Sequence, residues 1–300
     1  MEAAQLQRIH AYLRVAAPRG RDTERIGSFL ATFNRESDNP YLNYAIPDDG
    51  AQPSEADVGA LIDAYRARER RPRLEYVSSL APEVEPVLLA AGFEVEGRLP
   101  LMVYRGGEEQ APPAGIELVA AASDKELRGV ALAQWEAYEE GGPLPDCVVD
   151  SLRATLGNGG LVVLARDAVT GEPAGGGLCT GPHEGATELT SIGVRVAYRR
   201  RGIAEALTRR LARVMHARGN DGVFLMADGP PEERIYTRAG FATISDILHI
   251  SRPDMSQGQS LGHVFRSDPQ TRRVRTGPRD SPWDLSVVED DFARRANGVD

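Results

Sequence analysis

Three consecutive arginines stand at residues 199–201, immediately before a predicted helix. Cationic side chains at the start of a helix repel the positive end of its dipole, so the arrangement is unfavourable unless an anion lies among them. Gly202 lets the backbone approach a ligand closely, and the small side chain of Ala204 leaves the first helical turn open. Free N–H groups in such a turn can converge on a pyrophosphate. We call residues 199–204 the cradle and predict that it binds an anion.

Several other kinds of site do not fit the sequence. The cradle lacks the Gly-Lys-Ser/Thr ending of a P-loop and the three spaced glycines of a dinucleotide fingerprint, which disfavours nucleotide triphosphatases and dehydrogenases. Cys147 and Cys179 are the two cysteines, and the five histidines are scattered. Neither set has the paired spacing of a zinc site or a disulfide framework, so we expect no metal.

A second pattern lies downstream, where residues 235–241 are Ile-Tyr-Thr-Arg-Ala-Gly-Phe. Joined to the cradle at this spacing, it resembles the GNAT superfamily of N-acetyltransferases, whose acyl-CoA-binding motif has the core Arg/Gln-x-x-Gly-x-Gly/Ala. Arg199, Gly202 and Ala204 fill the three fixed places. The resemblance covers about half of the chain directly and the first half through an internal repeat.

The resemblance implies that acetyl-CoA donates an acetyl group to an amine by direct attack, with no covalent intermediate on either cysteine. A strand ending at Val194 would splay from its neighbour, so that the N–H groups of Val194 and Val196 face the pantetheine and the thioester. Tyr236 would protonate the departing thiolate. The residues expected to bind CoA are Val194, Arg195, Val196, Arg199, Arg200, Arg201, Gly202, Ile203 and Ala204.

Two assignments keep their alternatives. Glu188, at the start of the strand leading to Val194, is the candidate base, against the alternative of a solvated strand end; His183 in the preceding turn is the other candidate. Tyr236 could instead be a packing aromatic. The acyl length stays open, because Gly175–Gly177 could leave room beside the thioester for more than acetyl.

An internal repeat extends the resemblance to the first half. Ala-Gly-Phe occurs around Gly92 and again around Gly240, 148 residues later, and the same offset superposes the helical stretches 55–70 and 203–218. One register that matches several separate elements indicates duplicated domains. The cradle then falls on residues 51–56 and Tyr236 on Leu88, so the first repeat has lost both features.

The elements that must position these residues alternate between helix and strand. Ser123 and Glu126 form a capping-box pattern that opens the first predicted helix of the second half. The predicted helices are 124–138, 147–156, 202–218 and 231–239, and the predicted strands are 161–165, 175–179, 188–192, 223–226 and 243–250. We expect an α+β fold of two GNAT-like domains, each a mixed central sheet flanked by helices.

Composition bounds the remaining predictions. A formal charge of -9 disfavours nucleic acid as a partner. The amino end lacks a leader pattern and the chain lacks a long apolar run, so we expect a cytoplasmic protein without a membrane partner. The predicted division is a degenerate domain 1–105, a linker 106–115, a catalytic domain 116–253 and a poorly structured tail 254–300 with Pro282–Leu285 as its anchor.

The sequence supports an enzyme acting on a small-molecule or peptide amine. The rival is a non-catalytic acyl-CoA sensor or interaction module, and Tyr236 beside an intact cradle favours the enzyme. The acceptor cannot be named, and the sequence leaves a homodimer open.

Overall fold

The computed structural model describes residues 2–35, 37–140 and 142–253. The predicted tail 254–300, with its anchor, lies outside the described residues. The first half contains α1 (Glu2–Ala16), β1 (Asp22–Ile26), β2 (Phe29–Phe33), β3 (Ala45–Pro47), α2 (Glu55–Arg66), β4 (Arg73–Val77), α3 (Val84–Ala90) and β5 (Glu94–Tyr104). The second half contains β6 (Ile116–Ala120), α4 (Asp124–Ala137), α5 (Asp146–Gly157), β7 (Leu161–Asp167), β8 (Pro173–Cys179), β9 (Ala186–Val194), α6 (Ile203–Ala217), β10 (Gly222–Met226), α7 (Pro230–Arg238) and β11 (Phe241–Ser251).

The predicted helices and strands of the second half all form, with ends shifted by a few residues. Ser123 and Glu126 make the predicted capping box, in which each side chain bonds the other residue's backbone N–H. In the first half the helical stretch predicted as 55–70 ends earlier, at Arg66. The strand β6 was not predicted.

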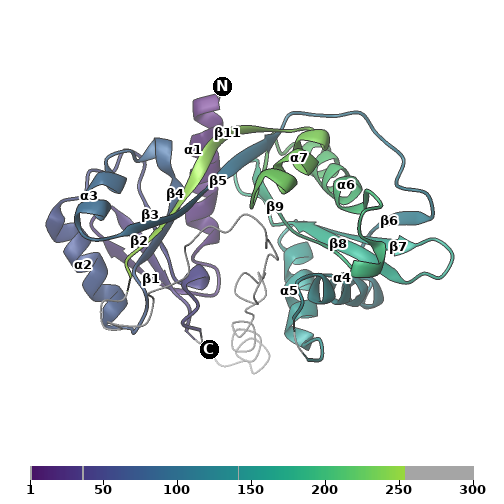
Figure 1. Ribbon diagram of the computed structural model, residues 1–300, viewed down its shortest axis with the longest axis horizontal. Helices are drawn as coiled ribbons and strands as arrows, with labels where there is room; N and C mark the ends of the chain where they lie inside the picture. Colours follow the sequence, from purple (N-terminus) through teal and green to yellow (C-terminus); the bar gives the residue numbers. More distant parts are fainter. Residues whose placement is uncertain (1, 36, 141, 254–300) are drawn as a thin grey trace, which may run out of the picture.

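The strands form one mixed sheet in the order β1-β2-β3-β4-β11-β5-β10-β9-β8-β7-β6. The last strand of each half is exchanged: β11 lies antiparallel between β4 and β5, and β5 lies antiparallel between β11 and β10. In Figure 1 these two long strands run side by side through the centre of the molecule. Each half therefore completes its sheet with a strand of the other, which refines the expectation of two separate sheets.

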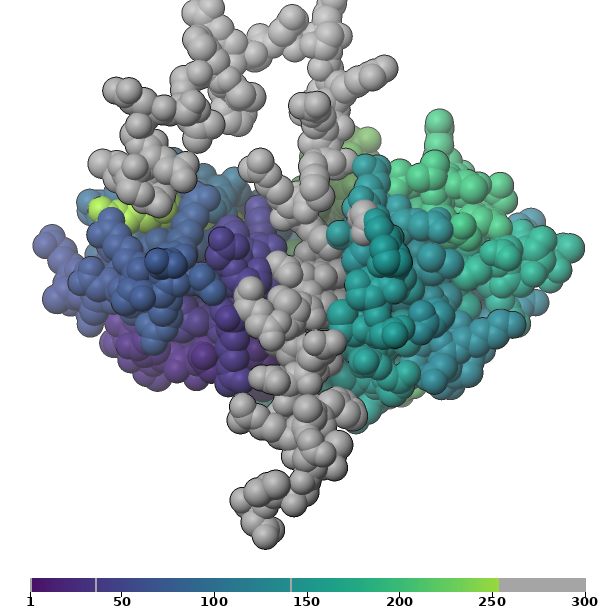
Figure 2. All heavy atoms as spheres, turned by 90° about the horizontal axis from the view of Figure 1, so that it is seen from below, coloured from purple at the N-terminus to yellow at the C-terminus, as the bar shows by residue number. Residues whose placement is uncertain are grey.

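The repeat is visible in this arrangement. Around the β5–β11 pair, β4 on one side and β10 on the other occupy equivalent places, as the 148-residue offset predicts. Figure 2 shows the first half, purple to blue, and the second half, teal to green, as two lobes on opposite sides of the molecule. The fold is α+β, with two related halves.

The hydrophobic core consists of separate clusters: some lie within one half, and one lies at the seam, where the central strands of the two halves meet. One cluster packs α2 and α3 onto the first half, and another packs α6 onto the second. The helix α1 covers the central strands, where Ile9 and Tyr12 pack against Val103 of β5 and Phe224 of β10. The seam is therefore apolar core, and burial of this kind is the main stabilising term of a fold.

Three glycines in β8 allow close packing on both faces of the sheet. A Cβ at Gly176 would lie 2.7 Å from Cγ1 of Val130 on α4, and one at Gly177 would collide with Ile192 of β9. A Cβ at Gly175 would lie 2.8 Å from the carbonyl oxygen of Gly193. The chain's own atoms fill the space beside these glycines, so the glycines themselves give no room for a longer acyl group, and the acyl length stays open.

Candidate active site

The amino end of α6 has the features expected of an anion cradle. Gly202 caps the helix in the left-handed region, with φ of 79°, and no side chain caps the helix. Arg200 is also left-handed, with φ of 64°. The first N–H groups of an α-helix lack partners within the helix, so an uncapped amino end offers them to a ligand.

The equivalent end of α2 in the first half is closed. Ser54 accepts a hydrogen bond from the Asp57 N–H, and the Asp57 carboxylate accepts from the Ser54 N–H at 2.9 Å. This capping box satisfies the helix end and places a negative charge where a phosphate would bind. Residues 51–56 contain no glycine, and the capping box closes the helix end that follows, so this segment lacks the open amino end seen at α6.

The side chains of the predicted CoA-binding arginines mostly hold the chain together. Arg199 donates from Nε to the carbonyl of Val194 and from Nη2 to that of Ala137, at 3.2 and 3.0 Å. Arg201 donates to the carbonyl of Ala197 at 3.1 Å. Arg195 pairs with Glu136 of α4 at 2.6 Å. These bonds fix the loop before Ile203, which is itself buried, whereas Arg200 is exposed.

The strand β9 separates from β10 as predicted from the resemblance. The two strands pair in parallel only from Ala186 to Glu188, whereas β9 continues to Val194. The Arg195 N–H donates to Ala174 of β8 at 3.0 Å, and in the alternating antiparallel pattern the Val194 N–H then points away from β8, toward the gap. Val196 has left the strand and begins a short 3-10 turn, Val196–Tyr198.

A bulge in β9 turns one further backbone N–H, that of Ile192, away from the neighbouring elements. Ser191 is left-handed, with φ of 57°, where the β8–β9 register shifts. Gln134 of α4 donates to the Ser191 carbonyl at 2.6 Å, and the Tyr138 hydroxyl donates to the Ile192 carbonyl at 3.4 Å. In a trans peptide the N–H points opposite to the C=O, so the N–H of Ile192 faces away from α4. Neither Tyr138 nor this N–H was predicted, because a bulge has no signal in the sequence here.

Tyr236 lies on α7 at the edge of the core cluster that includes Ile192 and Val194. Burial raises its pKa to about 12, with the nearby Glu232 and Asp228 acting in the same direction. Tyr236 in turn contributes, after burial, to raising the pKa of Tyr138. Tyr236 therefore keeps its proton throughout the neutral range.

Glu188 lies where β9 and β10 separate, and its surroundings come from both halves. Burial raises its pKa to about 7, and the Glu75 carboxylate on β4 of the first half adds to the effect. The Glu188 N–H donates to Oγ1 of Thr180 at 3.1 Å, and that same Oγ1 lies 2.5 Å from the Tyr12 hydroxyl of α1. His183 lies in the turn before β9 and bridges Ala186 through the backbone.

If Glu188 acts as a base, activity should rise with pH through about 7, because only its carboxylate can accept a proton. Replacing Glu75 with Gln should move this limb to lower pH, since one repelling carboxylate is removed and the pKa of Glu188 falls. The measurement is kcat/KM against pH for both proteins, with Glu83→Gln on the surface as the matched control. An acid limb unmoved by Glu75→Gln would contradict the coupling.

Within the described ranges, no group of three or more potential metal ligands occurs, and no helix is long and apolar enough to span a membrane. Both statements concern residues 2–35, 37–140 and 142–253 alone.

Comparisons with known proteins agree with this geometry. Residues 125–241 match the model of the acetyltransferase (GNAT) family. A GCN5-related N-acetyltransferase from Kribbella flavida has a TM-score of 0.66 at 23% identity, covering 83% of this chain and 95% of that one. A GCN5-related N-acetyltransferase from Sphaerobacter thermophilus has a TM-score of 0.56 at 20% identity, covering 75% and 78%. A tandem GNAT protein from the clavulanic acid biosynthesis pathway has a TM-score of 0.56 at 16% identity, covering 80% and 86%. No curated protein matches the sequence. At these identities the structures establish a shared fold, and one of them is described as a tandem GNAT protein.

Proposed function

We propose, since this chain belongs to the GNAT acetyltransferase family through residues 125–241, that its second half moves an acetyl group from acetyl-CoA to an amine acceptor. The observation that carries this proposal is the uncapped amino end of α6 beside the gap between β9 and β10. An anion site next to unpaired strand amides suits a ligand with a pyrophosphate at one end and an extended amide chain at the other.

The backbone amides of residues 201–204 would hold the pyrophosphate, and the pantetheine would pair with the free edge of β9. The Ile192 N–H faces away from α4 and the Val194 N–H points away from β8, so both are candidates to stabilise the oxyanion. The Ile192 donor is added here to the ones predicted from the sequence.

The neutral amine attacks the thioester carbon, and its proton passes to the Glu188 carboxylate, directly or through water. Collapse of the tetrahedral intermediate breaks the carbon–sulfur bond, and Tyr236 donates its proton to the departing thiolate. A pKa near 7 suits Glu188 to accept a proton at neutral pH, and a pKa near 12 keeps Tyr236 protonated.

CoA thiol release across a panel of amines is the direct test. Release with any amine supports the acetyltransferase, whereas acetyl-CoA binding without release for every amine supports the sensor. The amines should include small primary amines and peptides, because the acceptor is not identified.

We propose further that the first half, residues 1–105, binds no CoA and that residues 116–253 form the catalytic domain. The capped amino end of α2 supports this assignment. We expect one equivalent of CoA per chain by calorimetry, and two equivalents would contradict the assignment.

Replacing Gly202 with Val should abolish acetyl-CoA binding while the protein stays folded. A side chain there strains a left-handed cap and occupies the approach to the amides. The new Cβ would lie 3.7 Å from Pro113, an ordinary contact, so the fold has room for it. Gly219→Val is the matched control, because Gly219 is also left-handed, with φ of 91°, at the other end of α6. Calorimetry that shows unchanged affinity in folded Gly202→Val would refute the cradle.

A further inference from the structure

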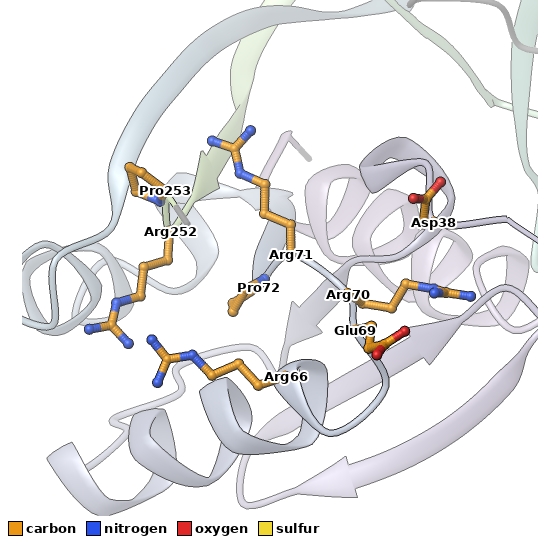
Figure 3. A pocket seen from close by; sticks show the side chains of 8 residues that line it. All are labelled: Asp38, Arg66, Glu69, Arg70, Arg71, Pro72, Arg252 and Pro253. Carbon is orange, nitrogen blue, oxygen red and sulfur yellow. The ribbon is translucent and has the colours of Figure 1, made fainter. Parts of the chain in front are cut away.

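A pocket of about 390 Å³ lies in the first half, away from the cradle. It is formed where α2 ends, where the chain enters β4 and where β11 ends. Its lining residues are Asp38, Arg66, Glu69, Arg70, Arg71, Pro72, Arg252 and Pro253 (Figure 3). Four arginines against two acids give the lining a positive balance in a chain whose formal charge is -9.

Two of the four arginines are already engaged. Arg70 donates to the carbonyls of Arg68 and Asn34 at 3.2 and 3.3 Å. Arg71 lies 3.7 Å from the carboxylate of Glu96. Figure 3 shows the guanidinium groups of Arg70 and Arg71 turned away from each other and away from those of Arg66 and Arg252.

Arg66 and Arg252, unlike Arg70 and Arg71, direct their guanidinium groups into the pocket. Figure 3 shows both guanidinium groups turned toward the same end of the pocket. Within the part of the chain that the structure describes, neither forms an ion pair or a side-chain hydrogen bond, although Glu69 follows Arg66 by one turn. Two guanidinium groups that converge without an acid repel each other, and an anion between them removes that repulsion.

The backbone of Arg252 is fixed by the fold. Its N–H donates to the carbonyl of Pro72 at 2.9 Å. A backbone fixed in this way lowers the ordering cost of binding.

We propose that this pocket binds the phosphate group of a small phosphorylated molecule through Arg66 and Arg252. Each guanidinium presents a planar fork that fits two oxygens, and a tetrahedral phosphate has enough oxygens for two forks at once, whereas a carboxylate fills one. Glu69 and Asp38, on the opposite side in Figure 3, confine the anion to the end near the two arginines. The volume admits a small metabolite. The site is independent of the acyltransfer chemistry.

The test is calorimetry of inorganic phosphate and of glycerol phosphate with the full chain, at constant ionic strength and with saturating CoA to occupy the cradle. Arg66→Gln and Arg252→Gln should each weaken binding by about tenfold, because each removes one charged fork. Glu69→Gln should strengthen it, since a repelling carboxylate is lost. Arg128→Gln, on the surface of the second half and paired with Asp146, is the control that should change nothing.

Tighter binding of glycerol phosphate than of inorganic phosphate would identify an organic monoester as the ligand, and equal binding would identify free phosphate; both support the site. No phosphate binding with CoA present, or equal affinity in the parent and both arginine variants, would overturn it.

Discussion

Replacing Tyr236 with Phe should lower turnover by roughly 10²- to 10⁴-fold, the usual scale for loss of a general acid. The change removes one oxygen from a side chain that packs at the edge of the second-half core, so the fold and the acetyl-CoA affinity should persist. The high pKa of Tyr236 adds a second expectation: the parent enzyme should show no basic limb from this phenol below about pH 12. Single-turnover kinetics with saturating CoA and amine measure the step directly.

Two controls separate chemistry from packing. Tyr198→Phe alters a phenol next to the cradle, whose ring lies under Arg201, and should keep turnover near that of the parent. Leu88→Tyr restores the mapped residue of the first half and should create no second activity, because α2 remains capped. If Tyr236→Phe kept full turnover with chemistry rate-limiting, the acid would have to be another group or water.

A chain that begins at residue 116 should not fold by itself, although it contains the whole match to the GNAT family. Without the first half, β10 loses its neighbour β5, and β11 loses both β4 and β5. Met102 and Tyr104 of β5 also belong to the second-half core, where they are 0% and 3% exposed. The second half would lose these buried side chains, and truncating one core side chain of this kind already costs about 2–5 kcal/mol. The whole free energy of unfolding of a domain is roughly 5–15 kcal/mol.

Circular dichroism and hydrogen exchange on residues 116–253 measure this effect, and the residues 1–115 added as a separate chain should restore the fold. A cooperative melt of the isolated second half, as a monomer, would contradict the strand exchange. The outcome also bears on the proposed domain division, because units that arose by duplication need not fold alone.

Much of the second half could be predicted from local signals. The helix predicted at 202–218 is α6, Ile203–Ala217, because its apolar period and the glycine before it act within a few residues. The capping box at Ser123 and the left-handed Gly240 after α7 also depend on residues that are close in the sequence. The uncapped cradle follows from residues next to one another in the chain.

The rest depends on contacts between distant residues. No pattern in the sequence states that β5 pairs with β10 and β11, because strand partners are chosen by the whole sheet. The raised pKa of Glu188 depends on Glu75, which belongs to the other half. Tyr138 and the bulge at Ser191 become candidates only once α4 is seen to contact β9. The packing around the glycines of β8 could not be predicted, because the atoms that fill their space come from α4 and β9.

The exchanged strands make this molecule equivalent to a strand-swapped dimer of half-length chains joined end to end. In such an ancestor each subunit would have given its last strand to its twin, so neither could be lost without unfolding both. In the present chain the second half needs only the last strand of the first half, β5, and not the amino end of α2. The capping box that closes α2 therefore leaves the shared sheet intact.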